Sequence, residues 1–179
     1  MIILGVDPGS RVTGFAVIER KGATETLIDT GIIRVSTGDT HQLRLKQIYE
    51  ALSGLIASHL PDYCAVEMPV YGNNPQSMLK LGRVQATAML AALNRDVPVV
   101  EYSPKQVKKS VTGNGNASKE QVRYMIASIL SLGEVSELAL DASDAVAVAL
   151  CHAHRGPDTP GGSYRNWADF VKDNPDRTT

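Results

Sequence analysis

The first 35 residues constrain the fold most, because they hold three apolar runs with no room for a helix between them. Residues 2–7 (IILGVD), 14–20 (GFAVIER) and 26–35 (TLIDTGIIRV) are rich in β-branched and aromatic residues, which favour strands. The segment PGSRVT joins the first two runs, and proline and glycine are typical of tight turns. The sequence therefore predicts an antiparallel meander of three strands, the third with an irregularity at its glycine.

The rest of the chain predicts helices and two further strands. Apolar residues recur at helical spacing, or a capping residue precedes a helix-forming run, at residues 43–59, 77–93, 103–111, 119–132 and 141–154. Strands are expected at 63–67 (YCAVE) and 97–102 (VPVVEY), and residues 163–177 could form one short helix. This order of elements predicts an α/β fold with a mixed five-stranded sheet flanked by helices.

Length and composition fit a single globular domain. The chain has 179 residues, of which 43% are hydrophobic and 21% charged, an ordinary mixture for one domain. We expect this domain at residues 1–155, followed by a linker and a short C-terminal tail at 156–179. No run approaches the roughly 20 apolar residues of a membrane span. The start MIILGVDPGS lacks the basic region and cleavage site of a signal peptide, so a cytoplasmic protein without a membrane partner is expected.

The cysteines and histidines argue against a disulfide and against a zinc site. Cys64 and Cys151 are far apart in apolar surroundings, which favours two buried free thiols in a reducing compartment over a disulfide. His152 and His154 lie two residues apart on a predicted helix and therefore point from different faces, which favours a structural or solvent role. No set of His and Cys residues suggests a zinc site.

Basic residues gather in one part of a nearly neutral chain. The formal net charge is −1, yet residues 80–123 hold eight Lys and Arg against three acids, a local balance of +5. The eight are Lys80, Arg83, Arg95, Lys105, Lys108, Lys109, Lys119 and Arg123. Such a basic region predicts a face that binds a polyanion.

Four acids interrupt apolar stretches at the ends of predicted elements. Asp7 ends the first strand, Glu67 ends the fourth, and Asp141 and Asp144 open the last long helix, where residues three apart share one face. Singly, each acid could be a turn residue, a strand-end charge or a helix cap. Together, they offer oxygen ligands from several elements, as Mg²⁺ or Mn²⁺ requires. Two such ions about 3.5–4 Å apart can activate water and stabilise the leaving oxygen of a phosphodiester.

Four segments, in this order, resemble the RuvC family of Holliday-junction resolvases: GVDPGSRVTGFAVIE, AVEMPVYGNNPQSMLKLGR, EYSPKQVKKSVTGNGNASKEQV and LDASDAVAVALCHAH. The resemblance covers roughly residues 1–155. It implies a ribonuclease-H-like fold, a homodimer, divalent metal and cleavage of four-way DNA junctions in recombination and repair, with a branch-migration motor complex as partner. The family's catalytic acids fall on Asp7, Glu67, Asp141 and Asp144, so the last two are expected to hold metal rather than only cap a helix.

The same matching places DNA contacts. Lys108 and Lys119 occupy positions of the family's DNA-contacting lysines, although each alone could be an ordinary surface charge. The basic region adds four candidates, Lys80, Arg83, Lys105 and Lys109. Many members carry an aromatic residue three positions after the glutamate, where this chain has Val70 and then Tyr71. Either could open the junction; only Tyr71 can stack on a base.

The resulting hypothesis is a structure-selective endonuclease with two Mg²⁺ ions per site, for which Mn²⁺ could substitute. Water attacks a phosphate near the crossover and leaves 5′-phosphate and 3′-hydroxyl ends. A twofold dimer would match the symmetry of the junction. The helix at 77–93 is apolar almost all round in its last part, VQATAMLAAL, and is expected to form the dimer interface.

Three alternatives stay open. A related nuclease of the same fold could act on RNA, and only competition between substrates would distinguish it. A sugar-kinase or actin-like ATPase also opens with a strand, an Asp and a turn, but needs two such domains and a chain longer than 179 residues. A non-catalytic junction-binding protein would be expected to lack the four acids.

Overall fold

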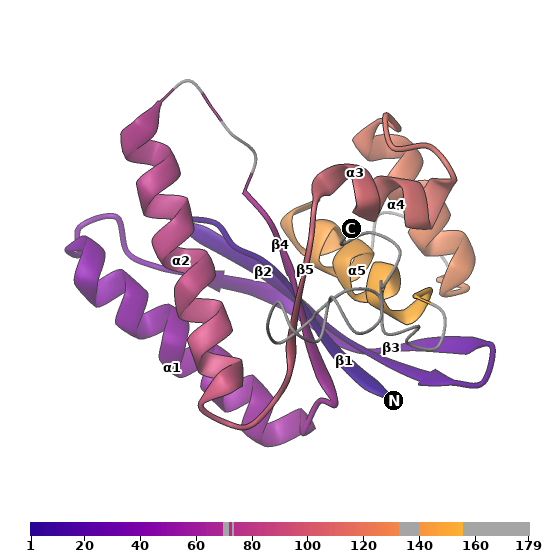
Figure 1. Cartoon of the computed structure of the whole chain (residues 1–179), viewed down its shortest axis with the longest axis horizontal. Coiled ribbons are helices and arrows are strands. Elements are labelled where there is room, and N and C mark those ends of the chain that lie inside the picture. Colours follow the sequence, from indigo (N-terminus) through magenta and orange to yellow (C-terminus); the bar gives the residue numbers. More distant parts are fainter. Residues whose placement is uncertain (70–71, 73, 133–139, 156–179) are drawn as a thin grey trace, which may run out of the picture.

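The sheet has five strands in the order β3-β2-β1-β4-β5 (Figure 1). The computed structural model describes residues 1–69, 72, 74–132 and 140–155. The strands are β1 (Ile2–Asp7), β2 (Val12–Lys21), β3 (Thr24–Arg34), β4 (Tyr63–Glu67) and β5 (Val99–Tyr102). Strands β1, β2 and β3 pair antiparallel, and β4 and β5 run parallel to β1. The predicted meander and the mixed five-stranded sheet are both confirmed.

One detail of the meander differs from the prediction. The register between β2 and β3 shifts where Val17 pairs with Asp29 and Ile18 pairs with Leu27, which makes Ile28 the extra residue of a bulge. The irregularity was predicted at Gly31, three residues further on, and that position is wrong. Gly31 pairs regularly with Phe15, and a Cβ on it would lie 3.0 Å from the Phe15 ring. This glycine therefore makes room for an aromatic side chain instead of breaking the ladder.

Helices cover both faces of the sheet. They are α1 (His41–His59), α2 (Pro75–Leu93), α3 (Pro104–Thr112), α4 (Lys119–Ile129) and α5 (Leu140–Ala153). Helices α1 and α2 pack on one face in a core that includes Leu4 and Val6. Helices α3, α4 and α5 contribute to the core on the other face, which includes Ile3 and Ala65 (Figure 1).

Helix boundaries follow the capping side chains. Ser103 and Ser118 each form a capping box at the start of α3 and α4, as their sequence context predicts. Helix α2 begins two residues before the predicted Ser77, because the Asn74 side chain accepts from the backbone N–H groups of Gln76 and Ser77. Helix α4 ends at Ile129, earlier than predicted, because Ser131 has a left-handed backbone with φ of 51°.

Strand alternation directs the two strand acids to one face. Successive side chains of a strand point to opposite faces. In β1, Ile3 belongs to the core beneath α5, whereas Leu4 and Val6 belong to the core beneath α1 and α2. By the same alternation Asp7 follows Ile3, and Glu67 follows Ala65 in β4. Both acids therefore point toward the face that α5 covers.

Helix α5 packs against β1 at unusually close range. A Cβ on Gly5 would collide with the backbone carbonyl of Ala145 and lie 2.8 Å from the Cβ of Ala149. Glycine on the strand and alanines on the helix thus allow the two backbones to approach. Because Asp144 directly precedes Ala145, this contact brings the start of α5 toward the end of β1.

The remaining sequence predictions on structure have mixed outcomes. Cys64 and Cys151 are buried and free, as expected. His152 is buried, with Nδ1 2.8 Å from the Tyr102 hydroxyl and its ring against Tyr63, which confirms a structural role. The predicted helix at 163–177 and the tail at 156–179 lie outside the described residues. Across the part of the chain that the structure describes, no helix is long and apolar enough to cross a membrane.

Candidate active site

Three acids converge where β1 and β4 end. The parallel register pairs Val6 with Val66, so Asp7 and Glu67 are the next residues on neighbouring strands. A side-chain hydrogen bond joins their two carboxyl groups. Two carboxyl groups can share a hydrogen bond only if one of them holds a proton. The two strands therefore hold Asp7 and Glu67 close enough for their carboxyl groups to interact.

The environment of this pair favours the protonated form. The pKa of Glu67 is raised to about 8, first by burial and then by the charge and hydrogen bond of Asp7 and the charge of Asp144, while Lys119 opposes the shift. Such clustering of negative charge in a partly buried place is unfavourable without a cation. Carboxylate oxygens also suit a hard divalent ion. The described acids therefore offer ligand atoms of the kind that a divalent ion requires.

Lys119 supplies positive charge at the same place. Its Nζ lies 2.8 Å from Oδ2 of Asp144. The hydrogen bond and charge of Asp144 raise the pKa of Lys119, burial opposes this rise, and the charges of Asp7 and Glu67 add to it. A first-turn lysine of α4 thus interacts with acids from β1, β4 and α5.

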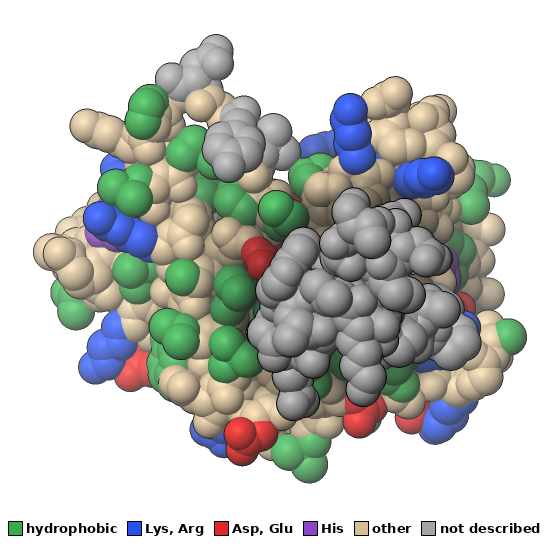
Figure 2. All heavy atoms as spheres, viewed as in Figure 1, with side chains coloured by type: hydrophobic (Ala, Val, Ile, Leu, Met, Phe, Trp, Pro, Cys, Tyr) green, Lys and Arg blue, Asp and Glu red, His purple; other side chains and the backbone are tan. Residues whose placement is uncertain are grey.

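A pocket of about 250 Å³ opens beside these groups. Its polar lining is Glu67, Asp144, Lys108 and Lys119, and its apolar lining is Pro104, Val107, Val122 and Ala147. A water occupies about 30 Å³, so the pocket has room for a phosphate group with water. Figure 2 shows Lys and Arg side chains on both the α1–α2 half and the α3–α4 half of the molecule. The apolar wall strengthens charge interactions by excluding water.

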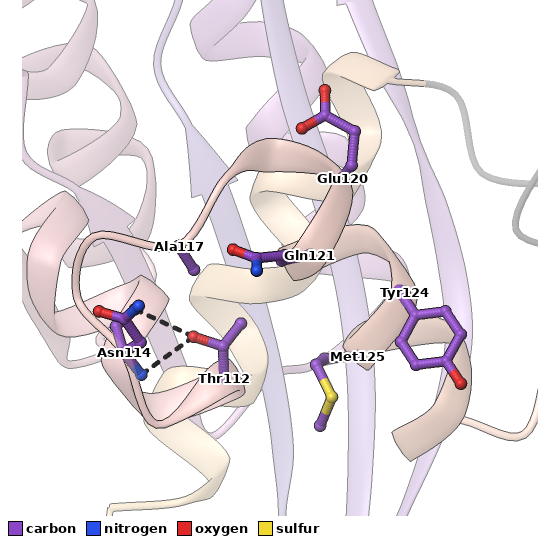
Figure 3. A pocket seen from close by; sticks show the side chains of 7 residues that line it. All are labelled: Thr112, Asn114, Ala117, Glu120, Gln121, Tyr124 and Met125. Carbon is purple, nitrogen blue, oxygen red and sulfur yellow. Dashed lines mark hydrogen bonds between the residues drawn. The ribbon is translucent and has the colours of Figure 1, made fainter.

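The turn between α3 and α4 sets the positions of the two lysines. Gly113 ends α3 in a left-handed conformation with φ of 77°, which favours glycine. Thr112 Oγ1 donates to the carbonyl of Asn114 and accepts from its N–H, at 3.0 and 3.1 Å (Figure 3). A separate pocket of about 420 Å³, lined by Tyr124 and Met125 among others, lies beside this turn (Figure 3). The turn joins α3, which carries Lys108, to α4, which carries Lys119, and both lysines line the acid pocket.

The other predicted DNA contacts lie apart from the acids. Lys105 and Lys109 are exposed on α3, and Lys109 lines a different pocket, together with Cys151 and His154. Lys80 and Arg83 are exposed on α2. Val70 and Tyr71 lie outside the described residues. Which of them opens the junction therefore stays a prediction from the sequence.

Asp141 lies in the first turn of α5, but its side chain is not among those described. Among the side chains that are described, no three of His, Cys, Asp or Glu are grouped closely enough to ligate one ion. The Asp144 carboxylate is instead paired with the Lys119 ammonium. The sequence analysis did not identify the apolar wall of the pocket, which includes Val107 and Val122. Their helical spacing could have indicated that both valines face inward.

A mixed sheet of this order, with acids at the ends of two neighbouring strands and a third on the helix packed over them, defines a nuclease of ribonuclease-H-like fold. Residues 3–152 match the family model described as crossover junction endodeoxyribonuclease RuvC. A protein of that description from Salinibacter ruber is 60% identical over 179 residues, which cover 100% of this chain and 99% of the relative. The chain belongs to this family, whose members are metal-dependent nucleases that act on phosphodiester bonds.

Solved structures agree with this assignment. The structure titled T. thermophilus RuvC in complex with Holliday junction substrate matches with a TM-score of 0.81 at 30% identity, and covers 86% of this chain and 93% of that chain. The yeast mitochondrial Holliday junction resolvase Ydc2 matches with a TM-score of 0.61 at 12% identity, and covers 85% of this chain and 78% of that chain. The latter likeness concerns the fold alone.

Proposed function

We propose that this chain resolves four-way DNA junctions in recombination and repair by hydrolysing phosphodiester bonds of the DNA. The proposed catalytic residues are Asp7, Glu67, Asp141 and Asp144. The observation that carries the proposal is geometric: Asp7 and Glu67 end neighbouring parallel strands, and Glu67 and Asp144 line one pocket. Family membership supplies the reaction class, and the relative solved with a Holliday junction supplies the substrate.

Two Mg²⁺ ions would be held by the four acids, with Mn²⁺ as a substitute. When bound, they supply an activated water and stabilise the leaving oxygen. Glu67 would give up its proton on metal entry, because its raised pKa reflects burial and neighbouring negative charge. Once Asp144 binds metal, the ammonium of Lys119 would leave this carboxylate and donate to a phosphate oxygen of the DNA, since it can donate three hydrogen bonds. Lys108, on the same pocket, would bind a neighbouring phosphate.

Symmetric cleavage requires two copies. We propose a homodimer in which each copy cuts one of two strands of like polarity and leaves 5′-phosphate ends, because a twofold dimer matches a twofold junction. Leu79, Leu90 and Leu93 of α2 are about half exposed or more and lie on one side of that helix, which supports α2 as the interface. A branch-migration motor complex as partner follows from the family resemblance, and the cytoplasm is the proposed compartment.

Cleavage of competing substrates tests this proposal. End-labelled four-way junction, linear duplex and RNA–DNA hybrid are incubated with the protein in Mg²⁺ or in chelator. We expect paired cuts near the crossover of the junction alone, and only with metal. Preferential cutting of the hybrid would instead support an RNA-directed nuclease of the same fold.

The lysines are tested in the same assay. Lys108→Ala and Lys119→Ala should each weaken junction binding at every junction sequence and lower the slope of log affinity against log salt by about one. Lys46→Ala is the matched control, because Lys46 is exposed and pairs with Glu50 on α1. Unchanged salt slopes for both variants would identify Lys108 and Lys119 as ordinary surface charges.

A further inference from the structure

A second basic cluster lies where the beginnings of α1 and α2 meet. His41 and Arg44 come from the first turn of α1, and Lys80 and Arg83 from the first half of α2. Burial lowers the pKa of His41, and the charges of Arg83, Lys80 and Arg44 lower it further. Helices α1 and α2 pack side by side in one apolar core cluster (Figure 1), which agrees with these four residues forming one group. Figure 2 shows Lys and Arg side chains beside a histidine on the α1–α2 half of the molecule.

This cluster has hydrogen-bond donors and charge in excess. Across the described residues, none of Arg44, Lys80 and Arg83 forms an ion pair with an acid. Arg44 donates to the backbone carbonyls of Thr37 and Asp39, which orient its guanidinium without neutralising it. His41 Nε2 is buried and lacks a hydrogen-bond partner in the described part of the chain.

The neighbouring residues do not offset this charge. Helix α2, residues 75–93, contains no Asp or Glu. The Asp39 carboxylate accepts from the Gln47 side chain, and Glu50 pairs with Lys46. Like charges held together are unfavourable unless an anion binds. The cluster therefore matches an anion with several acceptor oxygens, and a phosphate is such an anion.

The sheet places this cluster at the same end of the molecule as the acids. Pairing of β1, β2 and β3 brings the end of β3 at Arg34 to the end of β1 at Asp7. Helix α1 begins at His41, shortly after β3 ends, and α2 begins at Pro75, shortly after β4 ends at Glu67 (Figure 1). Both helices therefore point their N-termini, which favour anions, toward the acid end of the sheet.

We propose that His41, Arg44, Lys80 and Arg83 form a phosphate-binding site that holds the backbone of one junction arm away from the crossover. The inference rests on junction cleavage at the acid pocket, as proposed above. DNA is favoured over an acidic protein segment because the cluster shares the acid end of a nuclease, and the helices that carry it cover the face of the sheet opposite α3 and α4 (Figure 1). A DNA arm that leaves the acid pocket between this cluster and the lysines of α3 and α4 would contact both groups of basic residues.

Arm length distinguishes this site from the acid pocket. Junctions with hairpin-capped arms, shortened stepwise, are titrated in chelator, so that binding is measured without cleavage. Wild type should lose affinity once the arms no longer reach the cluster. Arg83→Gln and His41→Gln should bind long-armed junctions about threefold to tenfold more weakly, with a salt slope lower by about one. On the shortest arms, variants and wild type should bind equally.

Arg95→Gln is the matched control, because Arg95 is an exposed arginine just past the opposite end of α2; it should behave as wild type on every arm length. Crossover cleavage of short-armed junctions in Mg²⁺ tests the acid pocket separately and should survive in all variants. Equal losses at all arm lengths, or no loss at any, would overturn the arm site, and the latter would favour an acidic protein partner.

The His41 ring gives a second readout that does not depend on a variant folding. Its imidazole resonances in full-length wild type are followed against pH, with long-armed or short-armed junction. A bound phosphate would neutralise the surrounding cations and favour the imidazolium, so the pKa of His41 should rise with long arms only. An identical pKa in both complexes would contradict the proposed contact.

Discussion

The pKa of the Glu67 carboxyl group is raised because its position combines burial with two acid neighbours. Asp7 lies on the adjoining strand, Asp144 lies on the helix above, and Lys119 compensates only in part. Each acid alone would be an unremarkable strand-end or helix-start residue. Their chemistry arises from being held together, and it makes two predictions about single residues.

Asp7→Asn should abolish cleavage while leaving junction binding intact. The amide keeps the shape of the carboxyl group but removes the charge that would hold metal, so we expect a loss of about a thousandfold or more. Single-turnover cleavage in Mg²⁺ and gel-shift titration in chelator measure the two effects. Asp62→Asn, at the other end of β1, is the control and should cleave normally. Near-normal cleavage by Asp7→Asn would refute the assignment of the acid.

The raised pKa of Glu67 predicts how stability depends on pH in the metal-free protein. Between the ordinary value of 4.5 and about 8, the folded state holds a proton that the unfolded state has lost. The free energy of unfolding should therefore fall as pH rises through this window. Thermal unfolding in chelator measures it, and Glu67→Gln should remove this part of the slope. Added Mg²⁺ should stabilise the protein more at pH 8 than at pH 6, because metal needs the ionised carboxylate. A slope that is the same in wild type and Glu67→Gln would contradict the raised pKa of Glu67.

At the scale of elements, the contact of α5 with β1 positions the site. Asp7, Glu67 and Asp144 come from two neighbouring strands and this helix, and glycine at position 5 allows the helix to approach. Alanine-rich packing on α5 serves the same purpose: Ala142, Ala145 and Ala149 are almost fully buried. The distance between strand acids and helix acids thus depends on side chains that have no chemistry of their own.

Gly5→Ala should separate α5 from β1. The added methyl group would meet the backbone of Ala145, which cannot rotate away as a side chain can, so the free energy of unfolding should fall by about 1–3 kcal/mol. Cleavage should fall more than stability alone explains, since Asp144 moves with the helix. Urea unfolding and cleavage rates at saturating junction measure both. Gly54→Ala in α1, where an added Cβ meets nothing within 4 Å, should instead stabilise by about 0.5–1 kcal/mol. Full activity in Gly5→Ala would show that the close contact is dispensable.

At the scale of the whole molecule, the sheet separates two helical halves with different tasks. Helices α3, α4 and α5 enclose the acid pocket, whereas α1 and α2 carry the second basic cluster and an exposed apolar side. Met89 packs against the core on the α1–α2 face, so Met89→Glu is expected to destabilise the fold and does not test a dimer. The exposed leucines of α2 are the suitable positions for testing a dimer interface.

Leu90→Glu should dissociate dimers without unfolding the chain. Leu90 is 53% exposed, so a charge there is harmless in a monomer and unfavourable in an apolar interface. Sedimentation velocity at micromolar concentration measures the association, and urea unfolding of the variant checks its fold. Leu43→Glu on α1, which is 50% exposed, is the control and should stay dimeric. Wild-type protein that sediments as a monomer would rule out the interface on α2.

Features set by nearby residues were predictable from the sequence. The serine caps at 103 and 118 depend on side chains that accept from backbone N–H groups three residues on, and the turn glycine at 113 depends on its own left-handed backbone. The strand runs reflect the β propensity of their own residues. The four acids were recognisable because each breaks an apolar run, and the resemblance of four segments to one family gave them a role. Such signals are local, so periodicity and composition reveal them.

Features that depend on residues far apart in the chain were decided by the tertiary structure. Lys108 and Lys109 are neighbours in the sequence, yet packing of α3 directs the first to the acid pocket and the second to another. The raised pKa of Glu67 and the cluster around His41 arise between elements separated by dozens of residues. The bulge at Ile28 likewise depends on the partner strand. Local propensity determines which elements form, but burial, charge and register are properties of pairs of elements, and those pairs exist only in the folded chain.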